Sequence, residues 1–263
     1  MADPIHQFEI QPVLDLSQFS FALPGTSYVI DPSITNSVVA MAGAVALFTV
    51  FLTVVTAKAA VVPGRTQAVG EMLFGMIDNL VGSIIGHEGR RYFPYIFTLF
   101  LFILGMNMLG LFLVFTATSQ LAVTATLGVM TILLVLVVGL VKNGFGFFKL
   151  FVPSGVPWPV LPLIIPIEII SFLLRPVTLA LRLFGNMMGG HVALKVFAGF
   201  IASAVAMAVA GSGLMAGFIG VLSLGGVVAL TALEFLVAFL QAFVFAVLAT
   251  IYLNDVVNLG HGH

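Results

Sequence analysis

Long apolar runs separated by short polar segments dominate the hydropathy pattern of this chain. Three uncharged stretches each have close to the roughly 20 residues that cross the hydrocarbon core of a bilayer, and two longer apolar segments follow a proline-rich break at 152–159. The pattern predicts an all-α membrane protein with five transmembrane helices. The spans are expected at about 37–57, 92–115, 121–141, 163–210 and 214–253.

The stretch 66–86 has a different pattern. Its apolar residues recur with helical periodicity, whereas Gln67, Glu71, Asp78, Asn79 and Ser83 fall elsewhere. A helix with one polar face and several charges in or beside it is typical of an interfacial helix. We therefore expect 66–86 to lie along the membrane surface and not to span it.

The last two apolar segments are unusually long. A continuous helix of about 40 residues is roughly 60 Å long, about twice the thickness of the hydrocarbon core. Such helices must be steeply tilted, or broken at Pro176, Gly185, 189–190 and 225–226. Because a short turn at 211–213 joins the two segments, we expect a steeply tilted antiparallel hairpin.

Composition supports a membrane protein and excludes other classes. Of the 263 residues, 61% are hydrophobic and 7% are charged, with a net charge of -1. A chain without basic excess does not bind nucleic acid, and a chain without Cys has no disulfide scaffold. No Lys precedes Ser or Thr, so a Walker-A phosphate loop is absent. We expect no cofactor, no metal site and no catalytic site of its own.

Basic residues predict the topology, because cytoplasmic loops collect them. The acidic tail 1–36 has no Lys or Arg and no signal-peptide pattern. Basic residues gather at 58–91 and at 142–149. We therefore expect an extracytoplasmic N-terminal tail at 1–36, a single transmembrane domain at 37–263, and a cytoplasmic C-terminus.

Charged and polar residues interrupt the last two spans. Charge inside a membrane usually faces protein or water and marks an ion or proton path. If the hairpin turns at residue 212, Arg182 lies level with Gln241, His191 with Glu234, and Glu168 with Asp255. These three polar levels predict a proton path along the hairpin. The residues inside the spans are Glu168, Arg175, Arg182, His191, Lys195, Glu234 and Gln241.

Simpler interpretations exist for several of these residues. Arg175 and Lys195 are long enough to reach an interface or to bind a carbonyl group. His191 alone is compatible with a structural histidine, and Glu168 with a hydrated helix start. Three small residues next to Arg182 would let another helix approach closely. They are Gly185, Gly189 and Gly190.

Several segments resemble subunit a of the F-type ATP synthase. The most specific is Leu181-Arg182-Leu183-Phe184-Gly185-Asn186-Met187, followed by Gly189-Gly190-His191 and Gln241-Ala242-Phe243. The other matching segments are Pro63-Gly64-Arg65, Tyr92-Phe93-Pro94, Asn107-Met108-Leu109-Gly110 and Pro176-Val177-Thr178-Leu179. The resemblance covers about 63–253.

The resemblance implies roles for individual residues. Arg182 matches the essential arginine of the family, which faces the carboxylates of the rotating c-ring. Asn186 and Gln241 match its polar neighbours, and Glu168 matches an acidic position on the cytoplasmic access path. Some similar bacterial members have Glu in place of His191 and His in place of Glu234, so this pair is exchanged. Supporting roles are expected for Thr178, Gly185, Gly189, Gly190, Asn107 and Arg175.

The implied function is that of a stator subunit with two proton half-channels. Its expected partners are the c-ring, b-type subunits of the peripheral stalk, the lipid bilayer and protons. We expect the bacterial inner membrane in preference to the mitochondrial one. Two alternatives remain at this point: an ion-coupled secondary transporter, which also has broken helices and midplane charges, and a purely structural membrane anchor.

Overall fold

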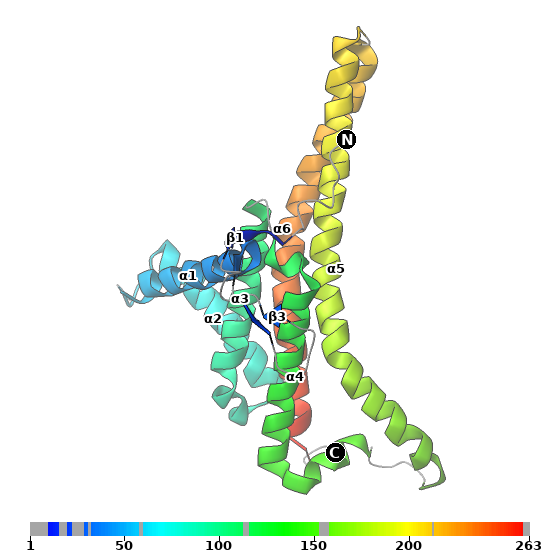
Figure 1. The fold of residues 1–263 in the computed structure, drawn as a ribbon. Coiled ribbons are helices and arrows are strands. Elements are labelled where there is room, and N and C mark those ends of the chain that lie inside the picture. The colour runs from blue at the N-terminus through cyan, green and yellow to red at the C-terminus, as the bar shows by residue number, and fades with distance from the viewer. Residues whose placement is uncertain are drawn as a thin grey trace. The chain divides into compact units, whose positions relative to one another are not determined.

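The structure is a computed structural model (Figure 1). The residues it describes are 10–15, 20–22, 29–30, 33–57, 60–112, 116–152, 158–211 and 213–259. Much of the acidic tail, most of the proline-rich break, Ser212 of the predicted turn and the last four residues lie outside this set.

Helices form almost all of the described chain. The long helices are α1 (Asn36–Ala57), α2 (Arg65–Ile84), α3 (Phe93–Phe112), α4 (Leu121–Asn143), α5 (Leu161–Val209) and α6 (Gly213–Val257). Short 3-10 helices are η3 (His87–Arg91), η4 (Ala117–Ser119), η5 (Gly144–Phe151) and η6 (Trp158–Val160).

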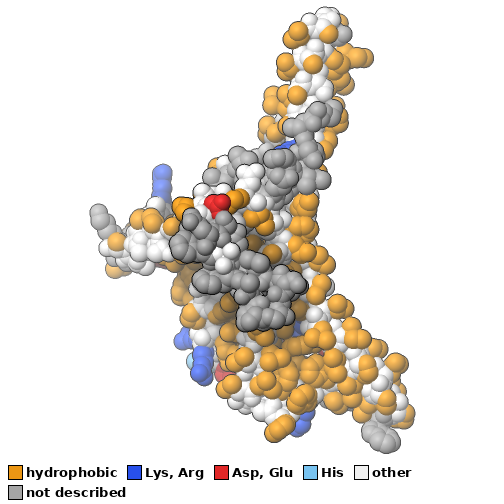
Figure 2. All heavy atoms as spheres, in the orientation of Figure 1, with side chains coloured by type: hydrophobic (Ala, Val, Ile, Leu, Met, Phe, Trp, Pro, Cys, Tyr) orange, Lys and Arg blue, Asp and Glu red, His pale blue; other side chains and the backbone are white. Residues whose placement is uncertain are grey.

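Five of the helices found in the described residues are long and apolar enough to cross a membrane. They are Asn36–Ala57, Phe93–Phe112, Leu121–Phe151, Leu161–Val209 and Leu214–Val257. Among the side chains that Figure 2 colours, most are hydrophobic and few are charged. Such a surface suits a hydrocarbon solvent, and the all-α membrane class is confirmed.

The N-terminal segment contains short strands that the hydropathy pattern did not predict. Its antiparallel pairs are β1 (Pro12–Leu14) with β4 (Ile34–Thr35), and β2 (Phe21–Ala22) with β3 (Val29–Ile30). The first pair leads directly into α1, since the amide of Asn36 donates to the carbonyl of Gln11 at 3.0 Å. Pairing between backbone groups creates these strands, which is why side-chain hydropathy gives no sign of them.

Helices α5 and α6 run without interruption through the positions at which breaks were considered. Helix α5 has 49 residues, about 74 Å at the usual rise, and contains Pro166 and Pro176. Helix α6 has 45 residues, about 68 Å. The alternative of broken helices is therefore wrong. Both helices exceed twice the hydrocarbon thickness, so their steep tilt in a membrane stays a prediction.

The chain divides into two compact units, which we describe separately. Unit 1 comprises Met1–Leu47, Gly105–Gln120 and Gly185–Phe239. Unit 2 comprises Phe48–Leu104, Leu121–Phe184 and Leu240–His263.

Helix α2, which lies in unit 2, is not among the five candidate spans. Its buried residues are Gln67, Gly70, Leu73, Ile77 and Val81, at helical spacing. Gln67 lies one turn before Glu71, on the side of the helix where the polar pattern placed it, but its side chain is buried. Its amide oxygen accepts from the backbone N–H of Ala60 at 3.1 Å, and its amide nitrogen donates to Glu71 at 2.7 Å. The side chain turns inward because it satisfies backbone groups that precede the helix.

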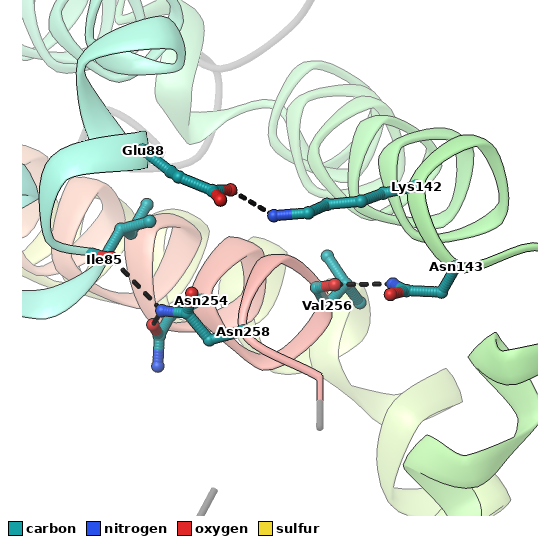
Figure 3. A network of polar contacts seen from close by, with 7 residues as sticks. All are labelled: Ile85, Glu88, Lys142, Asn143, Asn254, Val256 and Asn258. Carbon is teal, nitrogen blue, oxygen red and sulfur yellow. Dashed lines mark hydrogen bonds and ion pairs between the residues drawn. The ribbon is translucent and has the colours of Figure 1, made fainter. Parts of the chain in front are cut away.

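The end of α6 is held within unit 2 by amide side chains (Figure 3). The Asn143 amide nitrogen, from the end of α4, donates to the carbonyl of Val256 at 2.7 Å. The Asn258 amide nitrogen donates to the carbonyl of Ile85, just after α2, at 3.2 Å. These bonds satisfy carbonyl groups near helix ends, which lack partners inside their own helices.

A close approach of α4 and α5 in unit 2 gives the first testable prediction. A Cβ added at Gly128 would lie 2.7 Å from the carbonyl oxygen of Pro176, which is backbone and cannot swing away. Gly128→Ala should therefore destabilise the protein by about 1–3 kcal/mol, the usual cost of overpacking. Thermal unfolding in detergent measures the effect. Gly82→Ala is the control, because no atom lies within 4 Å of an added Cβ there; equal stability of the two variants would contradict the prediction.

Candidate functional site

In unit 1, α5 and α6 pack as the predicted antiparallel hairpin (Figure 1). An added Cβ at Gly190 would meet Glu234, one at Gly226 would meet Phe197, and one at Gly220 would meet Ala204. In each pair, the two residues are nearly the same number of positions away from residue 212 along the chain. The hairpin register inferred from equal helical rise on both arms is therefore confirmed in this unit.

Glu234 lies inside unit 1 without a hydrogen-bond partner. The residue is 7% exposed, and neither carboxylate oxygen has a partner among the described residues. Its carboxylate lies close to the backbone of Gly190, which has no side chain. A Cβ added at Gly190 would collide with Oε1 of Glu234. A buried carboxyl group of this kind requires a proton, a water molecule or a cation to satisfy it.

His191, one residue after Gly190, contacts a threonine that the sequence analysis missed. Its Nε2 lies 2.7 Å from Oγ1 of Thr116, a residue that is 2% exposed. The same hydroxyl donates to the carbonyl of Gly110 at 3.3 Å. Glu234 is thus next to His191 along the hairpin, but the two are not hydrogen-bonded to each other. That they form one functional unit stays a prediction.

Gly110 makes room for this threonine. An added Cβ there would collide with the Thr116 side chain, whose Cβ it would approach to 2.8 Å. The only sign of Thr116 in the sequence was its place in the short uncharged turn between two predicted spans. Nothing in a hydropathy pattern indicates which hydroxyl in such a turn faces a histidine 75 residues away.

Asn107 on α3 is fully buried in unit 1. Its amide nitrogen donates to the carbonyl of Ala238, one turn of α6 after Glu234, at 3.1 Å. Its amide oxygen has no partner in the described part of the chain. Asn107 and Glu234 thus contribute three acceptor oxygens without a partner among the described residues of unit 1, and the buried hydroxyls of Ser37 and Thr118 also lack one there. Such acceptor oxygens call for donors such as water.

Three of the predicted neighbours of Arg182 that belong to unit 1 are exposed. Gly185, Asn186 and Gly189 all face outward. No atom lies within 4 Å of an added Cβ at Gly185 or Gly189. The close approach of another helix was expected at Gly185, Gly189 and Gly190; among the described residues it occurs at Gly190 and not at the other two.

In unit 2, Arg182 is exposed although it lies within an apolar helix. Gln241, expected at the same level on α6, is 5% exposed. The structure thus places the guanidinium-bearing residue on the outside and the amide-bearing residue inside.

Arg175 and Asp255 form an ion pair in unit 2, which the sequence analysis did not predict. Nη1 of Arg175 lies 2.8 Å from Oδ2 of Asp255. The guanidinium also stands over the rings of Phe172 and Tyr252, at 5.4 and 4.7 Å from their centroids. Depth matching had placed Asp255 with Glu168, which is half-buried. The long arginine side chain reaches along the helix, so the depth of Cα atoms did not identify the partner.

An open groove of about 510 Å³ lies beside this pair. Its polar lining comes from Ser171, Arg175, Thr178 and Tyr252, and the rest is aliphatic. Oγ1 of Thr178 donates to the carbonyl of Arg175 at 2.9 Å. An open groove of this size with polar groups in its lining can hold water beside the ion pair.

Comparisons with known proteins identify relatives over nearly the full length. A family model described as ATP synthase A chain matches residues 38–254. The chain is 48% identical to ATP synthase subunit a of Chelativorans sp. (strain BNC1) over 260 residues, which is 98% of this chain and 99% of the relative. It is also 48% identical to ATP synthase subunit a of Maricaulis maris (strain MCS10), over 99% of this chain and 100% of the relative.

Proposed function

Because the chain belongs to the ATP synthase A chain family, we propose that it is the stationary membrane subunit that couples proton flow to rotation of a c-ring. The observation that carries this proposal is the exposure of Arg182. At least about 30 Å of the predominantly apolar helix α5, which also carries a few charged residues, lies on each side of it at the usual rise. An arginine facing lipid there would cost at least about 2.5–3.5 kcal/mol, so we infer that it faces a carboxylate of another subunit.

Arginine suits this role because its guanidinium stays protonated. A carboxylate that comes next to it is held in the ionised form. At 4 Å and an effective dielectric constant near 20, the attraction is about 4 kcal/mol. A c-ring carboxylate must then lose its proton before it passes Arg182 and regain one afterwards, which links proton movement to rotation.

Surface space beside Arg182 supports a partner at this face. Gly185 and Gly189 leave open space along α5, and Asn186 is exposed there. Positions 182, 185, 186 and 189 return to nearly one helix face. A helix of the c-ring would pack on this stripe.

Two half-channels would bring protons to and from the c-ring carboxylate. We assign His191, Glu234, Thr116 and Asn107 to the outer access path, because they combine titratable groups with unsatisfied acceptor oxygens. Glu168, Arg175, Thr178 and Asp255 are assigned to the cytoplasmic path, supported by the groove beside the ion pair. Gln241 is assigned to the polar surroundings of Arg182.

The test of the function is purification of the intact membrane sector from the native source. We expect the chain to copurify with an oligomeric ring of carboxylate-bearing helical hairpins and with b-type stalk subunits. After reconstitution with the catalytic sector, ATP hydrolysis should pump protons. A chain that instead purifies alone and binds a solute would be an ion-coupled transporter, and the proposal would be rejected.

Thr116 gives a prediction for the outer path. Its hydroxyl contacts Nε2 of His191 at 2.7 Å and thereby fixes the orientation of the imidazole ring. Thr116→Val keeps the shape but removes the hydroxyl, so proton flux in proteoliposomes should fall about tenfold, in keeping with a net loss of about 0.5–1.5 kcal/mol per hydrogen bond. Thr116→Ser should keep most of the flux. Equal flux in the two variants would show that the hydroxyl is not used.

The orientation of the chain gives another prediction. We propose that α2 lies at the cytoplasmic interface and braces the stalk subunits, with an extracytoplasmic N-terminus and a cytoplasmic C-terminus. A single Cys introduced at exposed Glu71 should react with a membrane-impermeant maleimide in inverted vesicles and stay unlabelled in intact cells. Labelling from the outer side alone would reject this placement.

A further inference from the structure

None of the residues that line a cavity in unit 2 is assigned to the proton path. Its volume is about 800 Å³, and it opens between η3, at the start of α3, and the end of α4. Polar side chains line one part, among them Glu88, Arg91, Tyr92 and Lys142. Valines of α4 line the other part, among them Val137 and Val141.

The charges of the cavity favour one anionic group. Lys142 and Glu88 extend toward each other from the two sides and form an ion pair (Figure 3). Arg91 is exposed, and no ion pair of it is found within the described ranges. The pair is neutral as a whole, so the guanidinium of Arg91 remains to be neutralised. A planar guanidinium fork matches two oxygens of a phosphate group, and the nearby Tyr92 hydroxyl is a further donor.

The apolar part of the cavity indicates that the ligand carries hydrocarbon. Val137 is 56% exposed and Val141 is 83% exposed, one turn apart on the same face of α4. That face belongs to a helix that is apolar enough to cross a membrane. In a membrane, the face would therefore extend along the lipid tails. A free phosphate ion would not use these valines, whereas a phospholipid would use both parts of the cavity.

We propose that this cavity binds an anionic phospholipid, with the phosphate on Arg91 and an acyl chain along Val137 and Val141. Basic pockets between membrane helices are suited to such headgroups. The bound lipid connects the start of α3 to the end of α4. It lies next to the hydrogen bonds by which the side chains of Asn143 and Asn258 hold the end of α6 (Figure 3). The proposal does not depend on the proton-path assignments.

The test uses the purified complex in proteoliposomes of phosphatidylcholine that contain a small fraction of photoreactive phosphatidylglycerol. After illumination, labelled peptides are identified by mass spectrometry. We expect label on the segment 137–142. Arg91→Ala should lower this label about fivefold, the equivalent of about 1 kcal/mol for one basic residue at an anionic lipid surface. Arg90→Ala is the matched control, because Arg90 is exposed but does not line the cavity, and its label should be unchanged.

Three outcomes would overturn the proposal. Labelling of the segment by photoreactive phosphatidylcholine as strong as that by phosphatidylglycerol would mean that the headgroup charge is not recognised. Excess inorganic phosphate that abolishes the label would identify a soluble-anion site. Crosslinking of the segment to another polypeptide of the complex, in place of lipid, would identify a subunit interface. Loss of proton pumping in Arg91→Ala is not required, so this test is separate from that of the proposed function.

Discussion

Replacing Arg182 with lysine or alanine should abolish coupled proton transport while the complex still assembles. Alanine removes the charge that keeps a passing c-ring carboxylate ionised. An attraction of about 4 kcal/mol corresponds to roughly a thousandfold change in that equilibrium. Lysine retains a charge but loses the fork geometry, and its ammonium group can deprotonate when it is desolvated. ATP-driven proton pumping in inverted vesicles is the measurement.

Assembly must be measured in parallel, by the amount of chain recovered with the c-ring. Arg65→Lys is the matched control, since Arg65 is exposed at the start of α2 and outside the candidate spans. It should pump normally. Normal pumping by either Arg182 variant would reject the role given to this residue.

The second large effect is expected at Glu234. Glu234→Gln keeps the size of the side chain but cannot carry a proton, so proton flux should fall on the order of a hundredfold, the lower range of a general acid–base contribution. Glu234→Asp keeps a titratable carboxyl group and should retain more flux than Glu234→Gln. Both variants should assemble, because neither carboxylate oxygen makes a hydrogen bond that the fold would lose.

His191 and Glu234 can be tested as one functional unit by a double-mutant cycle. Replacing either residue with leucine should slow proton flux. The exchange His191→Glu with Glu234→His should restore much of it, because position 191 still faces the Thr116 hydroxyl and position 234 still faces the bare backbone of Gly190. If both single variants conduct normally, or if the exchange is no better than the worse single variant, the two residues do not form a relay.

The sequence determined where the helices lie and which helix levels meet. Hydropathy is a local property, so the five spans follow from runs of neighbouring residues. The hairpin register also follows, because two helices that leave one turn rise equally per residue. The rule set His191 level with Glu234, and in the structure Glu234 meets the neighbouring Gly190. Phe197 contacts Gly226 as the same rule requires.

Only the tertiary structure decided which side chains touch. Residue number gives the depth of a Cα atom, but not the rotation of a helix about its axis or the reach of a side chain. Hence Thr116 was missed as the partner of His191, the burial of Gln67 was not predicted, and Asp255 was matched with Glu168 where Arg175 is its partner. The exposure of Arg182 likewise depends on packing between distant segments, and no local pattern encodes it.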